Sequence, residues 1–582
     1  MQKLATGIAD FETLRGGGYL YVDRTHFIPK LEEVHRYPVI LRPRRFGKSL
    51  MVSMLACYYD LLKRDRFEEL FGGLWIAEHR TEEQGAYLVL RLSFAGLQAS
   101  ESVQALKRGF AGRVRGALVS FVKQYSAMLS SDVEYLLSAV QTTEDAAVML
   151  GLVMDILRAR DLKAYVLVDE YDNFVNELLA RKKNGQYYDL LASGGQVKAF
   201  YKALKEGANA GAVSRIFITG VSPLVLEDIT SGFNIAMHLT LDWEFNEMFG
   251  FTEEEVAELV ARVGGEGVEV GEAVELMREY YDGYLFSRKA RQRMYNPEMV
   301  LHFLKELARG EGYPEELLST NVRTDYERIR EVIGRVGEEE RLRILREVAE
   351  KGKVRSVLKR AFLLSEVGRP DNFVSLMHYL GFLTIDSAGM ASVTFRVPNE
   401  ATRKLLWEYA AEMLEQEGMG GGLDQIGEAL ETMATRGEVG RFVGLFRERF
   451  LKATSHRDER GLDERSLKFG LLAWFGLAEF YFVHSEAEMG GGYPDIYLRG
   501  DRARFPRARY DWVIEVKHVK KGGGDLEGAR REALAQLERY RADGRFRVEG
   551  GAETKYLALV FKGLEDIEVA ELDDGSGQPS GG

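Results

Sequence analysis

Residues 38–50 read PVILRPRRFGKSL, which is a short apolar run, a cationic loop and the start of a second apolar stretch. Gly47, Lys48 and Ser49 fit the end of the pattern G-x-x-x-x-G-K-[ST], whereas Arg42 stands where the pattern has its first glycine. PVIL is a candidate buried strand, and KSLMVSMLACYYDLL has helical spacing. The stretch therefore has the strand-loop-helix context that a phosphate-binding loop needs.

Further apolar runs alternate with long helical stretches. The strand candidates are AYLVLRLSF (86–94), KAYVLVDE (163–170) and RIFITGV (215–221). Continuous apolar strands separated by helices predict an α/β fold, in which a parallel sheet is covered by helices on both faces.

An acidic pair follows one of these strands, because VLV ends in Asp169 and Glu170. The first carboxylate is predicted to hold the Mg²⁺ of bound ATP, and Glu170 is predicted to orient the attacking water as a catalytic residue. Lys48 and the helix start would cradle the phosphates, and the Ser49 hydroxyl would reach the metal. The predicted ATP contacts are Arg44, Arg45, Phe46, Gly47, Lys48, Ser49, Leu50, Asp169 and Thr219.

Several of these residues keep two interpretations. Arg42, Arg44 and Arg45 make the loop strongly cationic, which predicts phosphate binding more by charge than by backbone. Arg44 and Arg45 either neutralise phosphate charge or hold the loop against the acidic strand end. Thr219 either senses the γ-phosphate or caps its strand, and an acidic pair after a strand is also an ordinary turn.

Size and composition limit the class of protein. With 582 residues and 46% hydrophobic content, the chain is globular and long enough for about three or four domains. Its one cysteine, Cys57, excludes a disulfide framework and favours a reducing cytoplasm. No signal peptide and no run of about 18 apolar residues is present, so no membrane partner is expected. A net charge of -12 argues against attraction of the whole protein to nucleic acid, so nucleic acid would need a local basic groove.

After the strands the chain turns mostly helical. Thr252 and Glu255 form a capping box at GFTEEEV (250–256), and residues 373–399 read as a helix followed by two short strands around SAGMA. The expected parts are a P-loop domain (1–248), a helical lid (249–370), a winged-helix-like region with a linker (371–418), a C-terminal α/β domain (419–568) and a disordered tail (569–582).

The chain resembles the prokaryotic AAA-ATPase-like proteins that carry a C-terminal PD-(D/E)xK nuclease domain. The matching stretches are YVDRT (21–25), RPRRFGKSL (42–50), VLVDEYDN (166–173), FITGVSPL (217–224), FGFTEEEV (249–256), YYDGYLF (280–286), YNP (295–297) and SLMHYLGFLTI (375–385). The resemblance implies a RecA/AAA-like P-loop sheet and a restriction-endonuclease-like C-terminal domain. It also implies that RPRRFGKS, without the first glycine, is the usual form of the phosphate-binding loop in this family. Tyr281, Asp282, Tyr295 and Asn296 resemble family signature positions or pack the lid.

The C-terminal domain contains the acidic stretches YPDIYL (493–498) and YDWVIEVKHVK (510–520). Asp495 and Glu515, with the Val516 carbonyl, are predicted to bind one or two Mg²⁺ ions, with Mn²⁺ as an alternative. Residues 515 and 517 share a strand face because side chains alternate, so Lys517 points to the same site and positions the water. Apolar neighbours make these charges costly to bury without a partner or a metal.

The resemblance adds supporting residues and leaves one loop open. It implies that Glu464, Glu486, Gln536 and Tyr540 support the nuclease site, the last two as a Q-x-x-x-Y element similar to that of RecB-like nucleases. LRGDRARFPRAR (498–509) is either a loop that contacts phosphates or a solvated hairpin tip.

The predicted function is ATP binding and hydrolysis coupled to Mg²⁺-dependent cleavage of nucleic acid, with DNA as the expected substrate. Two alternatives stay open. One is an ATP switch whose nuclease-like domain binds nucleic acid or a protein partner without cutting. The other is a DNA motor, which the lack of further helicase motifs and of a pore-loop pattern disfavours. A homo-oligomer is possible, because a neighbouring subunit often completes an AAA-type site, although no arginine finger is identified.

Overall fold

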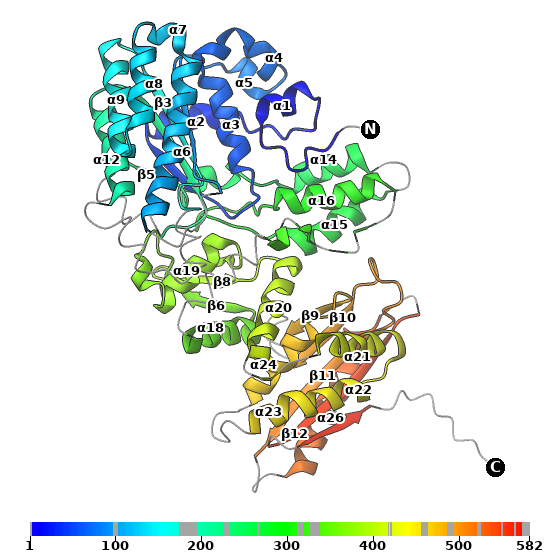
Figure 1. Cartoon of the computed structure of the whole chain (residues 1–582). Helices are drawn as coiled ribbons and strands as arrows, with labels where there is room; N and C mark the ends of the chain where they lie inside the picture. The colour runs from blue at the N-terminus through cyan, green and yellow to red at the C-terminus, as the bar shows by residue number, and fades with distance from the viewer. Residues whose placement is uncertain are drawn as a thin grey trace, which may run out of the picture. The chain divides into compact units, whose positions relative to one another are not determined.

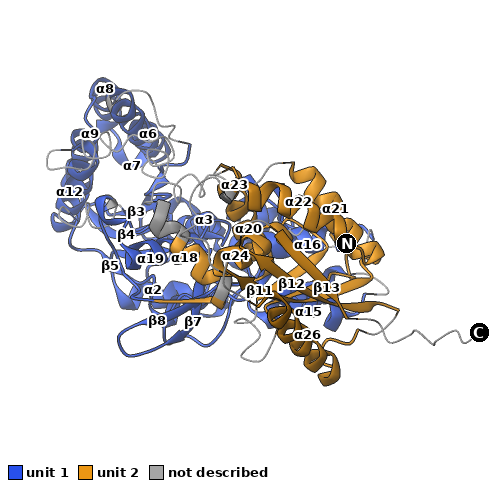
Figure 2. Ribbon diagram, turned by 90° about the horizontal axis from the view of Figure 1, so that it is seen from below, with its two compact units in different colours: residues 1–311, 318–340, 356–398 blue, residues 312–317, 341–355, 399–582 orange. Residues whose placement is uncertain are grey.

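The computed structural model describes residues 3–96, 103–173, 195–224, 233–264, 268–310, 313–314, 316, 318–320, 322–324, 338–416, 418–419, 422–455, 464–485, 494–520, 525–548, 551–563 and 566–572. The chain forms two compact units (Figure 2). The first consists of residues 1–311, 318–340 and 356–398, and the second consists of residues 312–317, 341–355 and 399–582. The predicted domain boundaries stay predictions.

The first unit is built on a five-stranded parallel sheet in the order β2-β3-β4-β1-β5. Its strands are β1 (Pro38–Leu41), β2 (Leu88–Ser93), β3 (Ala164–Asp169), β4 (Val213–Gly220) and β5 (Met237–His238). The predicted strands are therefore confirmed, and β5 is an addition. Because parallel strands end at the same sheet edge, the cationic loop after β1 and the acidic pair after β3 share one edge, with the end of β4 between them.

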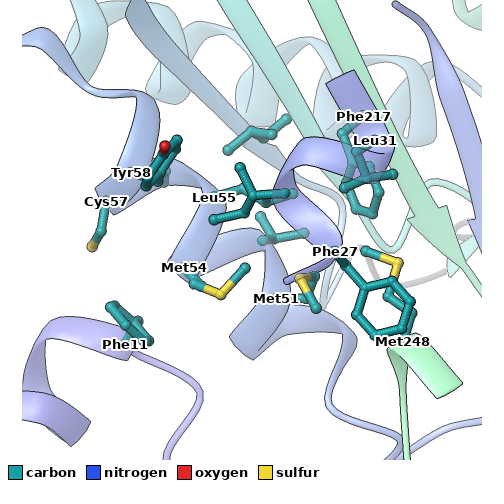
Figure 3. Close-up of a cluster of buried hydrophobic side chains, with 14 of the residues drawn as sticks. Phe11, Phe27, Leu31, Met51, Met54, Leu55, Cys57, Tyr58, Phe217 and Met248 are labelled. Atoms are coloured by element: carbon teal, nitrogen blue, oxygen red, sulfur yellow. The ribbon is translucent and has the colours of Figure 1, made fainter. Parts of the chain in front are cut away.

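One face of this sheet packs against α3 (Lys48–Tyr59), the helix that follows the cationic loop. Met51 and Leu55 of α3 gather with Phe27 of α2 (Phe27–Val34) and Phe217 of β4 in one hydrophobic cluster (Figure 3). Apolar residues occur all round α3, because this helix is buried on nearly every side. Its start is thereby fixed against the sheet.

The other helices of this part pack together as a separate group, α6 (Val103–Gln124), α9 (Ala146–Ala159) and α12 (Gln196–Asn209) (Figure 1). The rings of Phe110 and Phe200, from α6 and α12, lie 5.6 Å apart. Since α6 contacts β2 and α12 contacts β4, the sheet is covered by helices as predicted. Shorter elements nearby are α1 (Phe11–Gly16), η1 (Leu61–Arg66), α4 (Phe67–Phe71), α5 (Trp75–Glu78), α7 (Ser126–Leu129) and α8 (Asp132–Thr142).

The rest of the first unit is mostly helical. The elements are η2 (Trp243–Met248), α14 (Glu253–Val263), α15 (Val270–Tyr281), α16 (Pro297–Ala308), η3 (Leu364–Glu366), α19 (Pro370–Leu380), β7 (Thr384–Ala388) and β8 (Val393–Arg396). Thr252 and Glu255 form the predicted capping box of α14. Strands β7 and β8 pair antiparallel, with Thr384 opposite Arg396, so the predicted helix and hairpin of residues 373–399 are confirmed. The elements α18 (Glu338–Lys351) and β6 (Lys353–Ser356) fall mostly within residues 341–355, which belong to the second unit.

The second unit is built on a mixed five-stranded sheet in the order β13-β12-β11-β10-β9. Its strands are β9 (Tyr481–Ser485), β10 (Ile496–Gly500), β11 (Tyr510–Val519), β12 (Glu553–Lys562) and β13 (Asp566–Glu571). Only β11 and β12 pair in parallel, and α26 (Leu526–Asp543) connects them. The other helices are α20 (Glu400–Gln416), α21 (Leu423–Arg436), α22 (Gly440–Leu445), the π-helix η4 (Phe446–Leu451), α23 (Lys452–Ser455) and α24 (Glu464–Phe475).

Alternation along β11 sends its side chains to two different layers. Val513 packs against Leu537 of α26, whereas the indole of Trp512 donates to the Met433 carbonyl of α21 at 3.3 Å. Residues 513, 515 and 517 therefore point toward the α26 side. Among the described residues of either unit, no helix is long and apolar enough to cross a membrane.

Candidate functional sites

The cationic loop presents the start of α3 at the sheet edge. Gly47 is the N-cap residue of α3, with a φ of 89°, and no side chain caps the helix. A Cβ at Gly47 would meet nothing within 4 Å, so the approach to the first-turn N–H groups is open. Helix N-termini with exposed N–H groups attract anions. This geometry fits a phosphate group.

Lys48 is held by the carbonyl oxygens of its own loop. Its ammonium donates to the Arg42 oxygen at 3.0 Å and to the Pro43 oxygen at 2.8 Å. Burial lowers the pKa of Lys48 to about 8, although the charges of Asp169 and Glu170 act in the opposite direction. The fold thus brings Lys48 and the acidic pair within electrostatic range. A phosphate oxygen can take the place of either carbonyl as the acceptor.

The acidic pair has an unusual backbone. Glu170 has a φ of 50°, and its N–H donates to Asp169 Oδ1 at 2.9 Å. Burial, followed by the charge of Asp169, raises the pKa of Glu170, while Lys48 and Arg44 oppose the rise. The charges of Lys48 and Arg44 therefore act on Glu170, beside Asp169, within one part of the fold. Their assignment to ATP stays a prediction.

Asp172, which sequence reasoning missed, secures the acidic loop to β4. Its buried carboxylate accepts hydrogen bonds from the N–H groups of Val221 at 3.2 Å and Ser222 at 2.6 Å. Beside it, the Asn173 side chain donates to the Phe94 carbonyl at 3.1 Å. The only sequence signal was a further carboxylate and an amide, in VLVDEYDN, directly after the expected acidic pair.

The structure corrects the prediction for Arg42. This side chain is 1% exposed. It donates hydrogen bonds to the carbonyl oxygens of Leu41, Thr240 and Phe245. The guanidinium is therefore bound inside the fold and does not point to the phosphate-binding side of the loop. A buried guanidinium needs such acceptors, because an unpaired one is very costly. Of the three loop arginines, Arg44 and Arg45 stay candidates for neutralising phosphate charge.

Other predicted ATP residues have their side chains inside the fold. The Phe46 ring is buried 5.0 Å from Tyr284 and 5.3 Å from Phe286, so only its backbone is near the loop surface. The fully buried Thr219 hydroxyl donates to the Ile40 carbonyl at 2.9 Å, which is the bond expected of a strand cap. Leu50 packs partly buried against the α3 cluster, and Ser49 lies half-buried in the first turn.

In the second unit, two carboxylates lie on neighbouring strands. The pairing of Ile496 with Ile514 puts Asp495, which directly precedes β10, next to Glu515 of β11. Both side chains are buried, and Asp495 Oδ2 accepts a hydrogen bond from the Val516 N–H at 2.8 Å. Burial, followed by the charge of Asp495, raises the pKa of Glu515 to about 8. The predicted pair is thus brought together in a dry setting.

Lys517 lies on the same strand face as Glu515, as predicted. Its ammonium is 3.9 Å from Glu515 Oε2 and 3.2 Å from Glu532 Oε1 of α26. This lysine therefore bridges β11 and the following helix.

A second lysine, which sequence reasoning missed, also reaches this site. Lys468 of α24 places its ammonium 2.6 Å from Asp495 Oδ1 and 2.8 Å from Glu464 Oε1. Burial opposes the charge on Lys468, but Asp495 outweighs that effect and the pKa of Lys468 is raised. The signal was available, because Glu464 and Lys468 are one helical turn apart and share a face.

The other predicted supporting residues have different outcomes. The Gln536 Oε1 atom is buried and has no hydrogen-bond partner within the part of the chain that the structure describes. The Tyr540 ring packs 6.2 Å from Phe546 in the core beside α26. Glu486 lies outside the described residues, and the metal role of the Val516 carbonyl stays a prediction.

The residues present fit a small divalent cation only in part. Carboxylate oxygens such as those of Asp495 and Glu515 are ligands that Mg²⁺ prefers. Across the described residues, however, no group of three or more acidic, His or Cys side chains gathers as a ready metal site. Mg²⁺ commonly keeps several waters and takes one or two carboxylates, which agrees with two protein ligands.

The arginine-rich loop is partly explained by internal ion pairs. Arg502 pairs with the buried Asp511 at 2.5 Å, and Arg504 pairs with the buried Asp501 at 2.6 Å. These two residues therefore stabilise the hairpin, whereas Arg507 and Arg509 are exposed. Arg499 of the same stretch is half-buried, 4.2 Å from the centre of the Phe482 ring.

Comparison with known proteins matches two separate regions. Residues 5–230 match the family described as "Predicted AAA-ATPase", and residues 462–571 match the "PD-(D/E)XK nuclease superfamily". The chain is also similar to the "Uncharacterized protein in vnfD 5'region" of Azotobacter chroococcum mcd 1, with 28% identity over 306 residues. The match covers 52% of this chain and 52% of the relative, so the chain spans about half the length of the curated relative it matches.

Proposed function

Since the chain joins an AAA-ATPase-like domain to a PD-(D/E)XK nuclease superfamily domain, we propose that it binds and hydrolyses ATP in the first unit and cleaves nucleic acid, with DNA as the substrate, in the second. The observation that carries the proposal is that each unit gathers the charged residues of its reaction at one place. Lys48 is close to Asp169 and Glu170, and Asp495 is next to Glu515.

In the first unit, the residues divide the work of phosphoryl transfer. The start of α3 and the Lys48 ammonium would bind the phosphates, and Ser49 with Asp169 would hold Mg²⁺. Glu170, whose pKa is raised by burial and by Asp169, accepts a hydrogen bond from the attacking water and orients it. Asp172 keeps this acidic loop in place through the β4 end.

In the second unit, Asp495 and Glu515 would hold a divalent cation together with the Val516 carbonyl. Mg²⁺ or Mn²⁺, when bound there, supplies a low-pKa water and neutralises charge on the phosphodiester. Lys517, on the same strand face, orients that water toward phosphorus. Exposed Arg507 and Arg509 add phosphate contacts whose affinity falls with salt.

One specific observation favours a second candidate function. The ion pair of Lys468 with Asp495 offsets the buried charge of this carboxylate with a residue of the chain itself, as expected of a binding module that holds no metal. The alternative is therefore an ATP-dependent regulator that binds nucleic acid or a protein partner without cutting.

The test compares wild type, Lys48→Ala and Asp495→Ala. Each protein is incubated with single- and double-stranded DNA and RNA, with Mg²⁺ or Mn²⁺, with and without ATP, while phosphate release is measured. We expect Lys48→Ala to lose ATP hydrolysis and Asp495→Ala to lose cleavage. Nucleic-acid binding by wild type without cutting on any substrate would establish the regulator instead. Equal cutting by wild type and Lys48→Ala under all conditions would remove the coupling between the two activities.

A further inference from the structure

Lys468 occupies an acidic oxygen that the proposed metal also needs. Both oxygens of Asp495 are engaged, since Oδ1 is 2.6 Å from the Lys468 ammonium and Oδ2 accepts from the Val516 N–H at 2.8 Å. The N–H is part of the sheet backbone and cannot move away. The lysine side chain can move, because it reaches the site from α24 on a flexible stem.

We propose that Lys468 is an internal counter-ion of the metal site, which holds Asp495 Oδ1 until a divalent cation takes that oxygen, and that Glu464 then retains the displaced ammonium. This inference rests on the proposed nuclease function, because it concerns the same site. It assigns Glu464 a role as partner of Lys468 and not as a metal ligand.

The burial of the three residues supports this division of roles. The Asp495 side chain is 9% exposed, and that of Glu464 is 41% exposed, with Lys468 between them at 21%. Glu464 begins α24 and lies one turn before Lys468, so the two can stay paired while both turn toward solvent. The Asp495 side chain cannot turn toward solvent in this way, because it is buried and accepts a hydrogen bond from the Val516 N–H. A metal and an ammonium at one carboxylate oxygen would repel each other strongly in this setting.

Lys517 provides a matched control in the same site. Its ammonium is nearer to Glu532, at 3.2 Å, than to Glu515, at 3.9 Å, and it does not contact Asp495. Removing Lys517 takes away the same charge from the same neighbourhood but vacates no oxygen of Asp495. The two lysines therefore separate competition for an oxygen from general repulsion of the metal.

The first measurement is Mn²⁺ affinity of the full chain without nucleic acid, by calorimetry or by paramagnetic resonance of the free ion. We expect Lys468→Met to bind Mn²⁺ about tenfold more tightly than wild type, and Lys517→Met to show a clearly smaller gain. Equal gains in the two variants, or no gain in Lys468→Met, would overturn the proposal. Asp495→Asn should lose the binding, which locates the ion.

A double-mutant cycle tests the role of Glu464. In the wild-type background, Glu464→Gln should weaken Mn²⁺ binding, because Lys468 is then left with Asp495 alone. In the Lys468→Met background, the same change should have no effect. An equal loss in both backgrounds would make Glu464 a direct ligand and overturn its assignment as the partner of Lys468.

Thermal unfolding gives a second readout. It distinguishes failure of the proposed metal-dependent function from failure of the inference about Lys468 alone. Lys468→Met should melt at a lower temperature than wild type without metal and gain more from added Mn²⁺. If neither wild type nor Lys468→Met binds Mn²⁺ or is stabilised by it, both the proposed metal-dependent function and this inference fail. If wild type binds through Asp495 and Lys468→Met binds no better, the inference alone fails.

Discussion

The Arg42 guanidinium donates a hydrogen bond to the Phe245 carbonyl oxygen at 2.7 Å, across 203 residues of sequence. It also donates to the Thr240 carbonyl at 2.9 Å and lies 4.3 Å from the centre of the Phe286 ring. The residue at the first-glycine position of the loop therefore ties the end of β1 to the segment that leads into the helical part of the unit. Arg42 is therefore a structural residue.

This role predicts a loss of stability when Arg42 is replaced. Arg42→Met should lower the free energy of unfolding of the first unit by roughly 3 kcal/mol, because buried carbonyl oxygens lose their donors. Thermal denaturation of the full chain measures this change in the free energy of unfolding. Arg44→Met serves as the control, since Arg44 is only half-buried. Equal loss in both variants would contradict the special role of Arg42.

The two other loop arginines should act on the nucleotide. Arg44→Gln and Arg45→Gln should each weaken ATP binding by about 1 kcal/mol, roughly fivefold, because each removes one cation near the phosphates. Arg45 has a φ of 66°, and glutamine bears the same backbone strain there, so folding should be little affected. Titration with a fluorescent ATP analogue measures the affinity. Unchanged affinity would return both arginines to a structural role.

The sequence predicted those parts of the fold whose cause is local. Strand β1 and strand β3 were recognisable because both are apolar runs, the second of which ends at Asp169, and the Thr252–Glu255 capping box lies within one helical turn. The shared face of Glu515 and Lys517 followed from strand alternation alone. Each of these features needs no knowledge of a distant segment.

The missed features all depend on distant contacts. Two of the three carbonyl partners of Arg42 lie beyond β4, and the partners of Asp172 lie 49 and 50 residues away, directly after β4. Lys468 meets Asp495 only because α24 packs beside β9 and β11 in one particular rotation. A charged residue in a sequence does not reveal whether its partner is water, a ligand or a remote carbonyl.

Gly220 at the end of β4 has no room for a side chain. A Cβ there would lie 2.4 Å from Asp172 Oδ1 and 2.4 Å from the Tyr171 ring. Gly220→Ala should therefore displace the acidic loop, lower ATP hydrolysis and destabilise the first unit by about 1–3 kcal/mol. Phosphate release and the melting temperature are the two measurements.

Gly151 of α9 is the matched control for that substitution. A Cβ at Gly151 would meet nothing within 4 Å, and alanine is the better helix former. Gly151→Ala should leave ATP hydrolysis unchanged and stabilise the unit slightly. If both variants behaved alike, the tight contact at Gly220 would not be the cause of its effect.

His378 of α19 should make the stability of the first unit depend on pH. The ring is 3% exposed, and its Nδ1 lies 3.1 Å from the Leu383 carbonyl. Burial lowers the pKa of His378 to about 4; the Leu383 bond opposes this shift and the Arg42 charge adds to it. Between pH 4 and the ordinary value of about 6.5, the unfolded chain therefore binds a proton that the folded chain does not. The contribution of His378 to the free energy of unfolding therefore rises with pH across that window. At pH 5 this contribution is about 2 kcal/mol smaller than at pH 7.

His378→Gln removes this titrating group and keeps a polar side chain in its place. We expect wild type to exceed the variant in stability at pH 7 and this advantage to shrink by about 2 kcal/mol at pH 5. Other carboxyl groups titrate in both proteins and cancel in the comparison. Thermal unfolding of both proteins at the two pH values gives the result. An advantage that stays the same at pH 5 and pH 7 would show that the folded unit takes up a proton at His378 as readily as the unfolded chain does.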